Sequence, residues 1–404
     1  MKIAFFSDSY RPYTSGVVIS LETFKKELTA LDHNIYLFVP SYPNYQDKED
    51  NIFRFKAIPA PTNPDFTIAL PLSWYAKSVI RNFQPDIIHV HSPFMLGQLG
   101  ARYARQLNVP LVFTFHTLYE EYVHYVPLAP KITKKTTRYF CRNFCNKCDL
   151  IIVPTAEIGK YLKGLGVTTP VKKVPTGINM EDFTVQSTNG SWLRKNYDIA
   201  AEERLLLFVG RLGQEKNLTF LLQAYKEVQE EFPATRLVLV GGGPEEKNLK
   251  YLANQLGMAS KVVFTGALPK EKVIECYYAA DLFVFTSVTE TQGLVLPEAK
   301  AAGLPIIALS AYGAAEMVVD GEDGFLITPK LDREKETLAE FAAKIKLVLG
   351  QDELRNILCK QAKINAAQYS SRSCALSLEE GYKLAQETKE AQRHKGIKAY
   401  KNNR

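Results

Sequence analysis

Residues 281–302 read DLFVFTSVTETQGLVLPEAKAA and combine a short apolar strand, a polar loop and the start of a helix. The run DLFVFTS is continuously apolar, which is typical of a strand buried on both faces of a parallel sheet. The loop ends in ETQGLVLPE, whose two glutamates, Glu290 and Glu298, are its only charged residues. In sheets of this kind ligands bind beyond the carboxyl ends of the strands. This stretch therefore predicts a binding loop at such an end.

The same strand–loop–helix pattern recurs through both halves of the chain. The first half contains KIAFFSD, NIYLFVP, DIIHVHS, PLVFTFHT, LIIVPT and VKKVPTG, and the second contains RLLLFVGRL, TRLVLVGGG, KVVFTGAL, DLFVFTS, PIIALS and DGFLITP. Helical patterns separate most of these strands, which predicts an α/β protein with two doubly wound parallel-sheet domains. We place an N-terminal domain at 1–178, a C-terminal domain at 179–381 and a basic tail at 382–404, for which a return to the N-terminal domain is open.

The composition is that of an ordinary globular protein. The chain has 404 residues and is 46% apolar, a size that suits two domains rather than one core. No apolar run approaches the roughly 20 residues that a membrane-spanning helix needs. The N-terminal segment MKIAFFSDSYRPY lacks the apolar region and the cleavage site of a signal peptide. We therefore expect a cytoplasmic protein, or one attached to the inner face of the cell membrane.

Basic residues are concentrated toward the two ends of the chain. Residues 1–178 carry 21 Lys and Arg against 13 Asp and Glu, whereas residues 179–404 carry 29 against 30. Within that second part, residues 382–404 hold seven bases and two acids. Such an asymmetry predicts that one side of the molecule meets an anionic surface.

Three cysteines, Cys141, Cys145 and Cys148, have a spacing that also occurs in iron–sulfur proteins. Steps of four and three residues place the thiols on one helical face, and the strand LIIVPT follows directly. We therefore interpret them as helix residues and predict neither a metal site nor a disulfide framework.

Cations and glycines follow several strands of the second half at the points where those strands end. VGRLGQEKN contains Arg211 and Lys216, two cations placed to meet a diphosphate. VGGGPEE contains Gly241 to Gly243, which let another group approach the backbone closely. Taken singly, each feature has a structural explanation, such as an ion pair with a nearby acid. Their recurrence at four successive strand ends predicts one binding site.

The loop after the quoted strand is predicted to lead into a helix that opens at Gln292 and Gly293. The first amides of a helix have no intrahelical acceptor and form a site suited to phosphate groups. Glu290 precedes this helix and is placed to accept hydrogen bonds from sugar hydroxyls, while Glu298 is placed to bind a ribose diol. The two acids thus suit two parts of one ligand, a nucleotide diphosphate sugar.

Together, VGRLGQEKN, VGGGP, FTG and ETQGLVLPE resemble the donor domain of glycosyltransferase family 4, which has the GT-B fold. The resemblance covers nearly the whole chain. It implies two Rossmann-like domains that face a central cleft, and a retaining reaction, of which the Glu-x7-Glu pair is the family's signature. Front-face attack, in which two cations and helix amides stabilise the departing nucleotide, would need no protein-bound metal and no cofactor.

The resemblance also implies a set of donor-binding residues in the second domain. Glu290 is expected to contact the donor sugar, and Glu298 is expected to bind the ribose. Arg211 and Lys216 are expected to hold the diphosphate, and the resemblance implies catalytic roles for them and for Glu290. The other implied donor contacts lie in the loops: Gly243, Leu268, Gln292, Gly293 and Leu294.

The first half fits the same family with departures. RPYTSGVV matches the loop that meets the donor phosphates, but Ser15 precedes Gly16 where many members carry two glycines. TFHT places His116 at a strand end, where the family has a histidine near the reacting carbon. PTGINMEDF looks like the interdomain linker, with Asn179 where aspartate is common. The resemblance therefore implies Gly16 as a donor contact and His116 as a catalytic residue.

Two helical stretches of the first half point to a membrane surface. In LSWYAKSVIRNF, Trp74 lies on the polar face beside Lys77 and Arg81, an arrangement that suits a membrane interface. Stacking of Trp74 on Arg81 in water is the alternative. The apolar face of this helix is predicted to consist of Leu72, Tyr75, Ala76, Val79, Ile80 and Phe83.

The second stretch is PKITKKTTRYFCRNFCNK, in which five cations fall on one helical face and Phe140 and Phe144 lie opposite. No acid occurs from residue 129 to 148, and a solvated face usually mixes charges, so this basic stripe predicts binding to anionic lipid. Nucleic acid is disfavoured as a partner, because its binding calls for aromatic residues within the basic groove. The stripe consists of Lys131, Lys134, Lys135, Arg138 and Arg142.

Within the family, SPFMLGQLG and TFHTLYEEYVHYVP look most like bacterial enzymes that glucosylate diacylglycerol. The sequence therefore predicts a retaining transferase that moves glucose from UDP-glucose to the 3-hydroxyl of 1,2-diacylglycerol. A phosphatidylinositol mannosyltransferase and a transferase with a soluble sugar acceptor are the alternatives. A nicotinamide-dependent oxidoreductase is disfavoured, because SDSYRPYTSG follows the first strand instead of a G-x-G-x-x-G turn.

Overall fold

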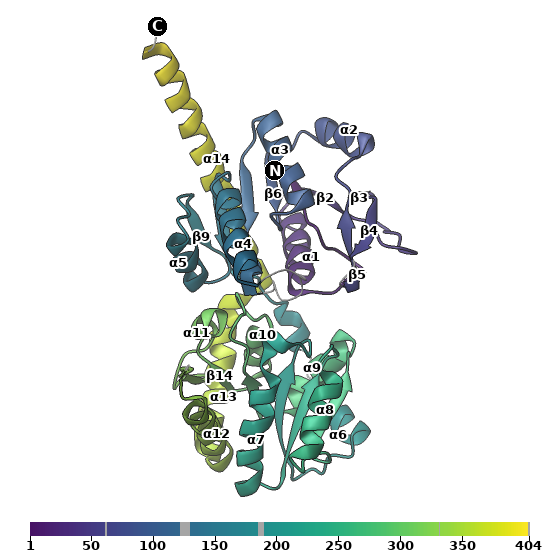
Figure 1. The fold of residues 1–404 in the computed structure, drawn as a ribbon, viewed down its shortest axis with the longest axis vertical. Helices are drawn as coiled ribbons and strands as arrows, with labels where there is room; N and C mark the ends of the chain where they lie inside the picture. Colours follow the sequence, from purple (N-terminus) through teal and green to yellow (C-terminus); the bar gives the residue numbers. More distant parts are fainter. Residues whose placement is uncertain (61–62, 122–129, 185–189, 331, 403–404) are drawn as a thin grey trace. The chain divides into compact units, whose positions relative to one another are not determined.

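The computed structural model describes residues 1–60, 63–121, 130–184, 190–330 and 332–402, and in it the chain divides into two compact units. Unit 1 comprises Met1–Gly177 and Ser371–Arg404, and unit 2 comprises Ile178–Ser370 (Figure 1). Each unit has its own parallel sheet, so the predicted α/β architecture is confirmed.

Unit 1 is built on a seven-stranded parallel sheet of order β3-β2-β1-β6-β7-β8-β9. The strand order reverses at β1, which pairs with β2 on one side and β6 on the other. The strands are β1 (Lys2–Phe6), β2 (Asn34–Pro40), β3 (Ile52–Phe55), β6 (Ile87–Val90), β7 (Leu111–Thr114), β8 (Leu150–Val153) and β9 (Val171–Lys173), and an antiparallel pair, β4 (Ala57–Ala60) and β5 (Asn63–Ala69), lies apart from them.

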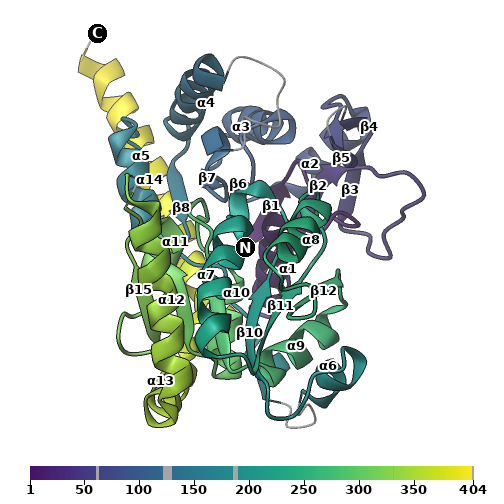
Figure 2. The ribbon, with the colours of Figure 1, turned by 60° about the horizontal axis from the view of Figure 1, so that its bottom comes forward.

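The helices of unit 1 follow the strands in the manner of a doubly wound fold, as Figure 2 shows from a second direction. Among the described residues they are α1 (Gly16–Thr29), α2 (Trp74–Phe83), α3 (Met95–Leu107), α4 (Pro130–Cys145), α5 (Ala156–Gly164) and α14 (Ser371–Asn402), and the 3-10 turn η1 (Tyr119–Glu121) follows β7.

The C-terminal helix α14 belongs to unit 1 from its first residue, so the second boundary lies at Ser371 and not at residue 382 as we predicted. The reason is an apolar stripe along α14 that is buried against the first sheet with Ile3, Leu150 and Ile152. This stripe contains Cys374, Ala375, Leu378, Tyr382 and Ala385. With α14 included, unit 1 carries 29 Lys and Arg against 17 Asp and Glu.

Unit 2 repeats the plan with a six-stranded parallel sheet of order β12-β11-β10-β13-β14-β15. Its order reverses at β10, between β11 and β13. The strands are β10 (Arg204–Val209), β11 (Thr235–Val240), β12 (Val262–Gly266), β13 (Leu282–Phe285), β14 (Ile306–Leu309) and β15 (Gly324–Ile327). The helices are α6 (Ser191–Asn196), α7 (Leu218–Glu231), α8 (Glu246–Gln255), α9 (Lys270–Ala279), α10 (Val295–Ala302), α11 (Tyr312–Met317), α12 (Glu334–Gly350) and α13 (Asp352–Ala366), with 3-10 turns η3 (Met180–Phe183), η4 (Gln214–Lys216) and η5 (Ala367–Tyr369).

The strands of unit 2 are apolar on both faces because each face has its own core. Along β10, Leu206 and Phe208 belong to one core, and Leu205 and Leu207 belong to the other. Side chains of a strand alternate between its two faces, so a continuous apolar run is what two helical layers require. The polar loops are thereby confined to the ends of the strands.

Candidate active site

The candidate donor site of unit 2 lies where the strand order reverses, at the carboxyl ends of β10 and β13. The turn η4 follows β10, and hydroxyl groups just beyond β13 hold it in place. Thr286 Oγ1 donates to the carbonyl oxygen of Lys216 at 2.9 Å, and Ser287 Oγ donates to that of Glu215 at 3.0 Å. Both hydroxyl residues are buried. The loop carrying Lys216 is therefore fixed to the loop that leads to Glu290.

Lys216 and Glu290 form an ion pair between Nζ and Oε1. Their side chains are only 15% and 21% exposed, so the pair lies in a partly desolvated position. The carbonyl oxygen of Glu290 also accepts a hydrogen bond from the amide of Gly313, at 2.9 Å. A Cβ on Gly313 would lie 2.6 Å from the amide nitrogen of Gln292, so only glycine permits this packing. The sequence predicted both charged residues at the site and left open an ion pair of Lys216 with a nearby acid, but it did not identify Glu290 as that partner.

The glycines after β11 pack against the chain's own backbone. A Cβ on Gly241 would lie 2.0 Å from the carbonyl oxygen of Gly210, and one on Gly243 would lie 2.4 Å from that of Leu212. The amide of Leu212 donates to the carbonyl oxygen of Gly242 at 3.0 Å. The group that approaches these glycines closely is thus the backbone of the loop that carries Arg211. The side chain of Arg211 is exposed. A donor contact at Gly243 stays a prediction.

Helix α10 begins at Val295, so our prediction that it opens at Gln292 and Gly293 is wrong. Gly293 has a φ of +76°, a left-handed conformation that stops the helix from extending back to it. Leu294 is the N-cap. The amides at the helix start are therefore those of Leu294 and Val295. An anion placed there would still meet the positive end of the helix dipole.

Glu298 lies in the first turn of α10 and is half-buried. The hydroxyl of the fully buried Tyr277 donates to Glu298 Oε2 at 2.8 Å. Burial raises the pKa of the Glu298 carboxyl, and the hydrogen bond from Tyr277 opposes this change. The hydrogen bond thus restricts the orientation of Glu298, and its contact with a ribose stays a prediction.

The remaining predicted donor contacts of unit 2 lie on the same edge of the sheet. Leu268 follows β12 and is half-buried against the core that also contains Tyr277. Gln292 is buried beside Gly313. Neither position reveals a ligand contact, so both assignments stay predictions.

In unit 1, Gly16 is exposed at the first position of α1. Ser15 is the N-cap of this helix and accepts a hydrogen bond from the amide of Val18 at 3.3 Å. This cap gives a structural reason for serine at this position, because Ser is a preferred N-cap residue. A donor contact at Gly16 stays a prediction.

His116 lies just beyond β7 and is half-buried. Its Nε2 lies 3.0 Å from Nδ1 of His91, which follows the neighbouring strand β6. Burial lowers the pKa of His116 to about 3, so the ring is neutral at physiological pH. A ring with so low a pKa is a poor proton acceptor but can donate a hydrogen bond. The sequence identified His116 but not its partner.

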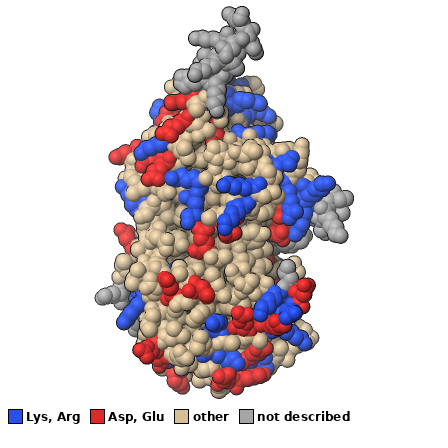
Figure 3. All heavy atoms as spheres, turned by 90° about the vertical axis from the view of Figure 1, so that its left-hand side faces the viewer, with Lys and Arg blue, Asp and Glu red and all other residues tan. Residues whose placement is uncertain are grey.

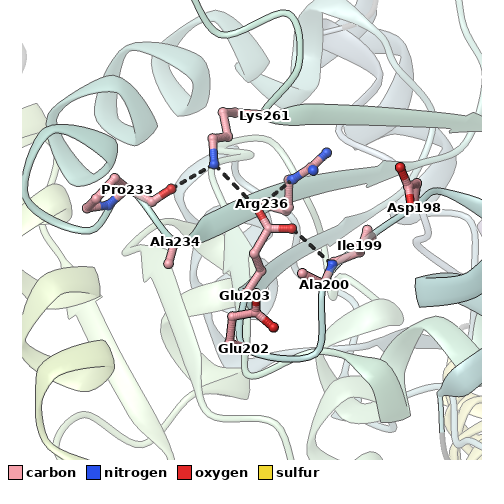
Figure 4. Close-up of a pocket in the computed structure, with 9 residues that line it drawn as sticks. All are labelled: Asp198, Ile199, Ala200, Glu202, Glu203, Pro233, Ala234, Arg236 and Lys261. Carbon is pink, nitrogen blue, oxygen red and sulfur yellow. Dashed lines mark hydrogen bonds and ion pairs between the residues drawn. The ribbon is translucent and has the colours of Figure 1, made fainter.

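A separate cavity of unit 2 lies at the opposite, amino ends of its strands (Figure 4). Glu203 is central to it and accepts from Arg236 Nε at 2.9 Å, Lys261 Nζ at 3.3 Å and the amide of Ala200 at 3.2 Å. Burial alone would raise the pKa of Glu203, but these bonds lower it below its ordinary value. Because Glu203 binds both neighbouring cations and the amide of Ala200, we interpret the cluster as a structural network that joins β10, β11 and β12.

Helix α2 exposes more apolar surface than its sequence predicted. Ala76, Ile80 and Phe83 are buried as expected, whereas Tyr75, predicted for the same face, is 69% exposed. Leu72 precedes the helix and is 87% exposed, so it does not belong to an apolar face either. The alternative, in which Trp74 stacks on Arg81, is wrong about the cation. The ammonium of Lys77 lies over the Trp74 ring instead, 5.8 Å from its centre. Trp74 itself is 90% exposed.

The basic stripe of α4 is partly neutralised by acids from the preceding turn η1. Arg138 binds Glu120 through two hydrogen bonds of 2.7 Å, and Lys134 Nζ lies 3.0 Å from Glu121 Oε2. Burial would raise the pKa of Glu120, but its bonds from Arg138 and Tyr161 lower it. Figure 3 shows acidic side chains among basic ones on one face of unit 1. The expectation of a stripe without nearby acids is therefore wrong for these two cations.

The other stripe residues differ in their surroundings. Lys135 is exposed, and Arg142 is half-buried with its guanidinium 5.2 Å from the ring centre of Tyr139. The side chain of Lys131 lies outside the described residues. Phe144 is buried on the opposite face as predicted, whereas Phe140 is 36% exposed and stacks on Phe94.

Cys141 and Cys145 lie in α4 as predicted, whereas Cys148 lies beyond the end of that helix, and all three are buried. Burial raises the pKa of each thiol, to about 12 for Cys141 and Cys145, so the thiols are protonated at neutral pH. Among the described residues, the structure has no helix long and apolar enough to cross a membrane.

The fold and site together define a protein with two Rossmann-like units, of which the second carries a cation–carboxylate pair and a helix amino end at its switch point. Known proteins and family models agree with this description. Residues 14–182 match the model of "Glycosyltransferase Family 4", and residues 192–365 match that of "Glycosyl transferases group 1". The structure has the GT-B fold, and it resembles that of Anabaena Alr3699/HepE in complex with UDP, with a TM-score of 0.76 at 21% identity over 94% of this chain and 99% of that one.

Two sequence relatives extend over most of the chain. The alpha-monoglucosyldiacylglycerol synthase of Acholeplasma laidlawii is 30% identical over 395 residues, which is 95% of this chain and 96% of the relative. The alpha-monoglucosyldiacylglycerol synthase of Streptococcus pneumoniae (strain ATCC BAA-255 / R6) is 34% identical over 312 residues, or 76% of this chain and 71% of the relative. The chain therefore belongs to the glycosyltransferases of family 4, as the sequence motifs predicted.

Proposed function

We propose that this protein transfers glucose from UDP-glucose to the 3-hydroxyl of 1,2-diacylglycerol, with retention of the anomeric configuration, at the cytoplasmic surface of the cell membrane. The observation that carries this proposal is the near full-length similarity to the alpha-monoglucosyldiacylglycerol synthase of Acholeplasma laidlawii, which spans both units. The predicted donor motifs fall within the matched length.

The ion pair of Lys216 and Glu290 supports a specific course of donor binding. The free-energy cost of partial desolvation is lower for two opposite charges that are paired than for either charge alone. When UDP-glucose enters, Lys216 turns to the diphosphate and Glu290 accepts hydrogen bonds from the glucose hydroxyls. Arg211 and the amides of Leu294 and Val295 complete the binding of the phosphates, and Glu298 binds the ribose.

The reaction needs stabilisation of charge more than transfer of protons by the protein. As the bond between glucose and the diphosphate breaks, negative charge grows on the leaving phosphate oxygen. Lys216, Arg211 and the amino end of α10 stabilise that charge, while the departing phosphate accepts the proton of the lipid hydroxyl. On this view no metal ligand from the protein and no cofactor take part. His116 would donate a hydrogen bond to a substrate oxygen.

The proposal predicts which donor and acceptor give product. The purified protein, mixed with diacylglycerol in vesicles, should use UDP-glucose at least about fivefold faster than GDP-mannose or UDP-galactose, since one mismatched polar contact costs about 1–3 kcal/mol. With UDP-glucose as donor, a soluble sugar acceptor should react more slowly than diacylglycerol. GDP-mannose is included because a relative at 29% identity is named a GDP-mannose-dependent alpha-mannosyltransferase.

Mass spectrometry would identify the product of each reaction, and the proton coupling of its anomeric carbon would report the configuration. An α-glucoside of diacylglycerol supports the proposal. Transfer of mannose, or transfer to a soluble sugar only, would contradict the proposed reaction and support one of the alternative glycosyltransferase reactions. A β-anomer would contradict retention.

Membrane attachment is expected to have a salt-dependent and a salt-independent part. Replacing Lys135 and Arg142 with serine should weaken binding to anionic vesicles about 30-fold at 0.1 M salt, because each cation contributes roughly 1 kcal/mol at such a surface. The effect should fade at 1 M salt, where the screening length is about 3 Å. Replacing the exposed Trp74 and Tyr75 with alanine should weaken binding at both salt concentrations, because burial of apolar surface is not screened.

Co-sedimentation with vesicles of neutral and of anionic lipid would measure both parts. The wild-type chain is the reference, and UDP affinity is the control, since the predicted donor residues of unit 2 are unchanged. Equal binding to both vesicle types at every salt concentration would show that the stripe is not an anchor.

A further inference from the structure

A line of polar side chains crosses the otherwise apolar sheet of unit 1 between β6 and β7. The two strands pair in parallel with His89 opposite Val112 and Val90 opposite Phe113. Side chains two residues apart share one face of a strand, so His89 and His91 of the first strand face the same way, as do Thr114 and His116 of the second. The segments HVH and TFH thus place two polar pairs side by side.

The first pair is satisfied on both sides. His89 Nε2 lies 2.7 Å from Thr114 Oγ1, and His89 Nδ1 lies 2.8 Å from the hydroxyl of Tyr382 on α14. All three residues are buried. A hydroxyl can donate or accept, so these contacts suit either tautomer of His89.

The second pair is asymmetric. His91 Nδ1 lies 3.0 Å from His116 Nε2, while His91 Nε2 is buried and has no hydrogen-bond partner among the described residues. Around His91 lie the ring of Phe5, at a centroid distance of 4.8 Å, and that of His89, at 4.1 Å. His91 is completely inaccessible to solvent. Burial lowers the pKa of His91 well below its ordinary value, so its ring carries one proton only.

The position of that one proton decides what His116 can do. If His116 Nε2–H donated to His91, the proton of His91 would sit on Nε2 as a buried donor without an acceptor. If His91 Nδ1–H donates to His116, only a lone pair of His91 is left without a partner. Orphaned N–H groups are the rarer and more costly of the two kinds. The second arrangement leaves the proton of a neutral His116 on Nδ1.

We propose that His91 is a positioning residue that holds His116 as the Nδ1–H tautomer, so that His116 serves as a hydrogen-bond donor to a substrate oxygen and not as a base. The part of this inference that concerns substrate rests on the proposed function, whereas the tautomer itself does not. His91 adds to the predicted site a residue that none of the sequence motifs singled out.

The tautomer can be read directly from nitrogen NMR. The chain has six histidines, so a protein labelled with ¹⁵N in histidine gives few signals, and those of His116 are identified by their loss in His116→Asn. We expect protonated Nδ1 and unprotonated Nε2 for His116 at neutral pH. The reverse assignment in the wild-type protein would overturn the proposal without any reference to activity.

Variants of His91 test the same point through function. His91→Phe keeps an aromatic ring but has no donor, and we expect its kcat to fall about 10- to 100-fold, the range found for outer partners of metal-bound histidines. The affinity for UDP should change less than about twofold, because UDP lacks the glucose that His116 is proposed to contact. His91→Asn offers an amide N–H near the position of Nδ1–H and should recover most of the loss.

Tyr382→Phe is the matched control, because it removes a buried hydroxyl from His89 and leaves the bond between His91 and His116 intact. It should keep near wild-type kcat. If His91→Phe retains both kcat and the His116 tautomer, the positioning role is wrong. If His116→Asn retains full turnover while the wild-type tautomer is as expected, the catalytic assignment of His116 fails and the tautomer assignment stands.

Discussion

Glu290→Gln is expected to lower the rate of glucose transfer at saturating donor by about 100- to 1,000-fold, which is the scale for loss of one preorganised polar group at a reacting centre. The side chain keeps its size, so the packing of Gly313 against the loop that carries Glu290 is preserved. Only the charge disappears, and with it the carboxylate proposed to hold the glucose hydroxyls. The measurement is kcat with UDP-glucose and diacylglycerol in vesicles.

Substitution of Lys216, the partner of Glu290 in the ion pair, distinguishes phosphate binding from sugar binding. Lys216→Ala should weaken the binding of UDP about 10- to 100-fold in calorimetry, because a hydrogen bond to a charged group contributes about 1.5–3 kcal/mol. Glu290→Gln should leave UDP affinity unchanged or slightly tighter, since it removes the group that competes with phosphate for Lys216.

Glu322→Gln is the control for a charge change alone, because Glu322 is exposed in the turn before β15 of the same unit. A Glu290→Gln protein that retains more than a third of the wild-type kcat would contradict the donor-sugar role. Unchanged UDP affinity in Lys216→Ala would place the phosphates elsewhere.

The course of the chain could be predicted from sequence because each element carries its own local signal. DLFVFTS and RLLLFVGRL are continuous apolar runs, and the structure forms strands at Leu282–Phe285 and Arg204–Val209 within them. The loops that follow are polar because they lie outside both cores. The predicted donor residues of unit 2 therefore fall on one edge of one sheet, which follows from the topology alone.

Interactions between distant segments could not be predicted in this way. The stripe of α4 has no acid in its own sequence, yet Glu120 of η1 binds Arg138. Similarly, the pair of Lys216 and Glu290 joins residues that are separated by 74 positions. Local periodicity assigns a residue to a face, but its partner on that face depends on how other elements pack.

The start of α10 was misplaced for a local reason. The sequence predicts a helix that opens at Gln292 and Gly293, but in the structure Gly293 adopts a left-handed conformation. Glycine is compatible with both interpretations, since it lacks a Cβ and populates positive φ readily. Pro297, in the first turn of the helix, is a more informative marker, because proline is tolerated in that turn and not in the interior.

Unit 2 contains a buried ion pair on α10, the helix that also carries Glu298. Lys300 of α10 and Asp323, which precedes β15, are both fully inaccessible to solvent, and their charged atoms lie 2.5 Å apart. Asp323 also accepts hydrogen bonds from the amide of Val319 and from Asn365 Nδ2 of α13, each at 2.8 Å. The aspartate thus joins three segments of the unit, whereas Lys300 has Asp323 as its anionic partner.

Asp323→Asn is therefore expected to destabilise unit 2 by about 3–5 kcal/mol, because it leaves the ammonium of Lys300 buried without a counter-charge. Lys300→Met should cost less, since the Asp323 carboxylate keeps its bonds from Val319 and Asn365. The double variant should be more stable than Asp323→Asn alone, because no buried charge then lacks a partner. Urea unfolding gives these differences, and in a Trp74→Phe background the remaining tryptophan, Trp192, reports unit 2 alone. Lys250→Met, which removes an exposed ion pair with Glu246 in α8, should change stability by less than about 1 kcal/mol. If Asp323→Asn costs no more than this surface change, Lys300 is accommodated without its partner, and the ion pair does not stabilise the helix that carries Glu298.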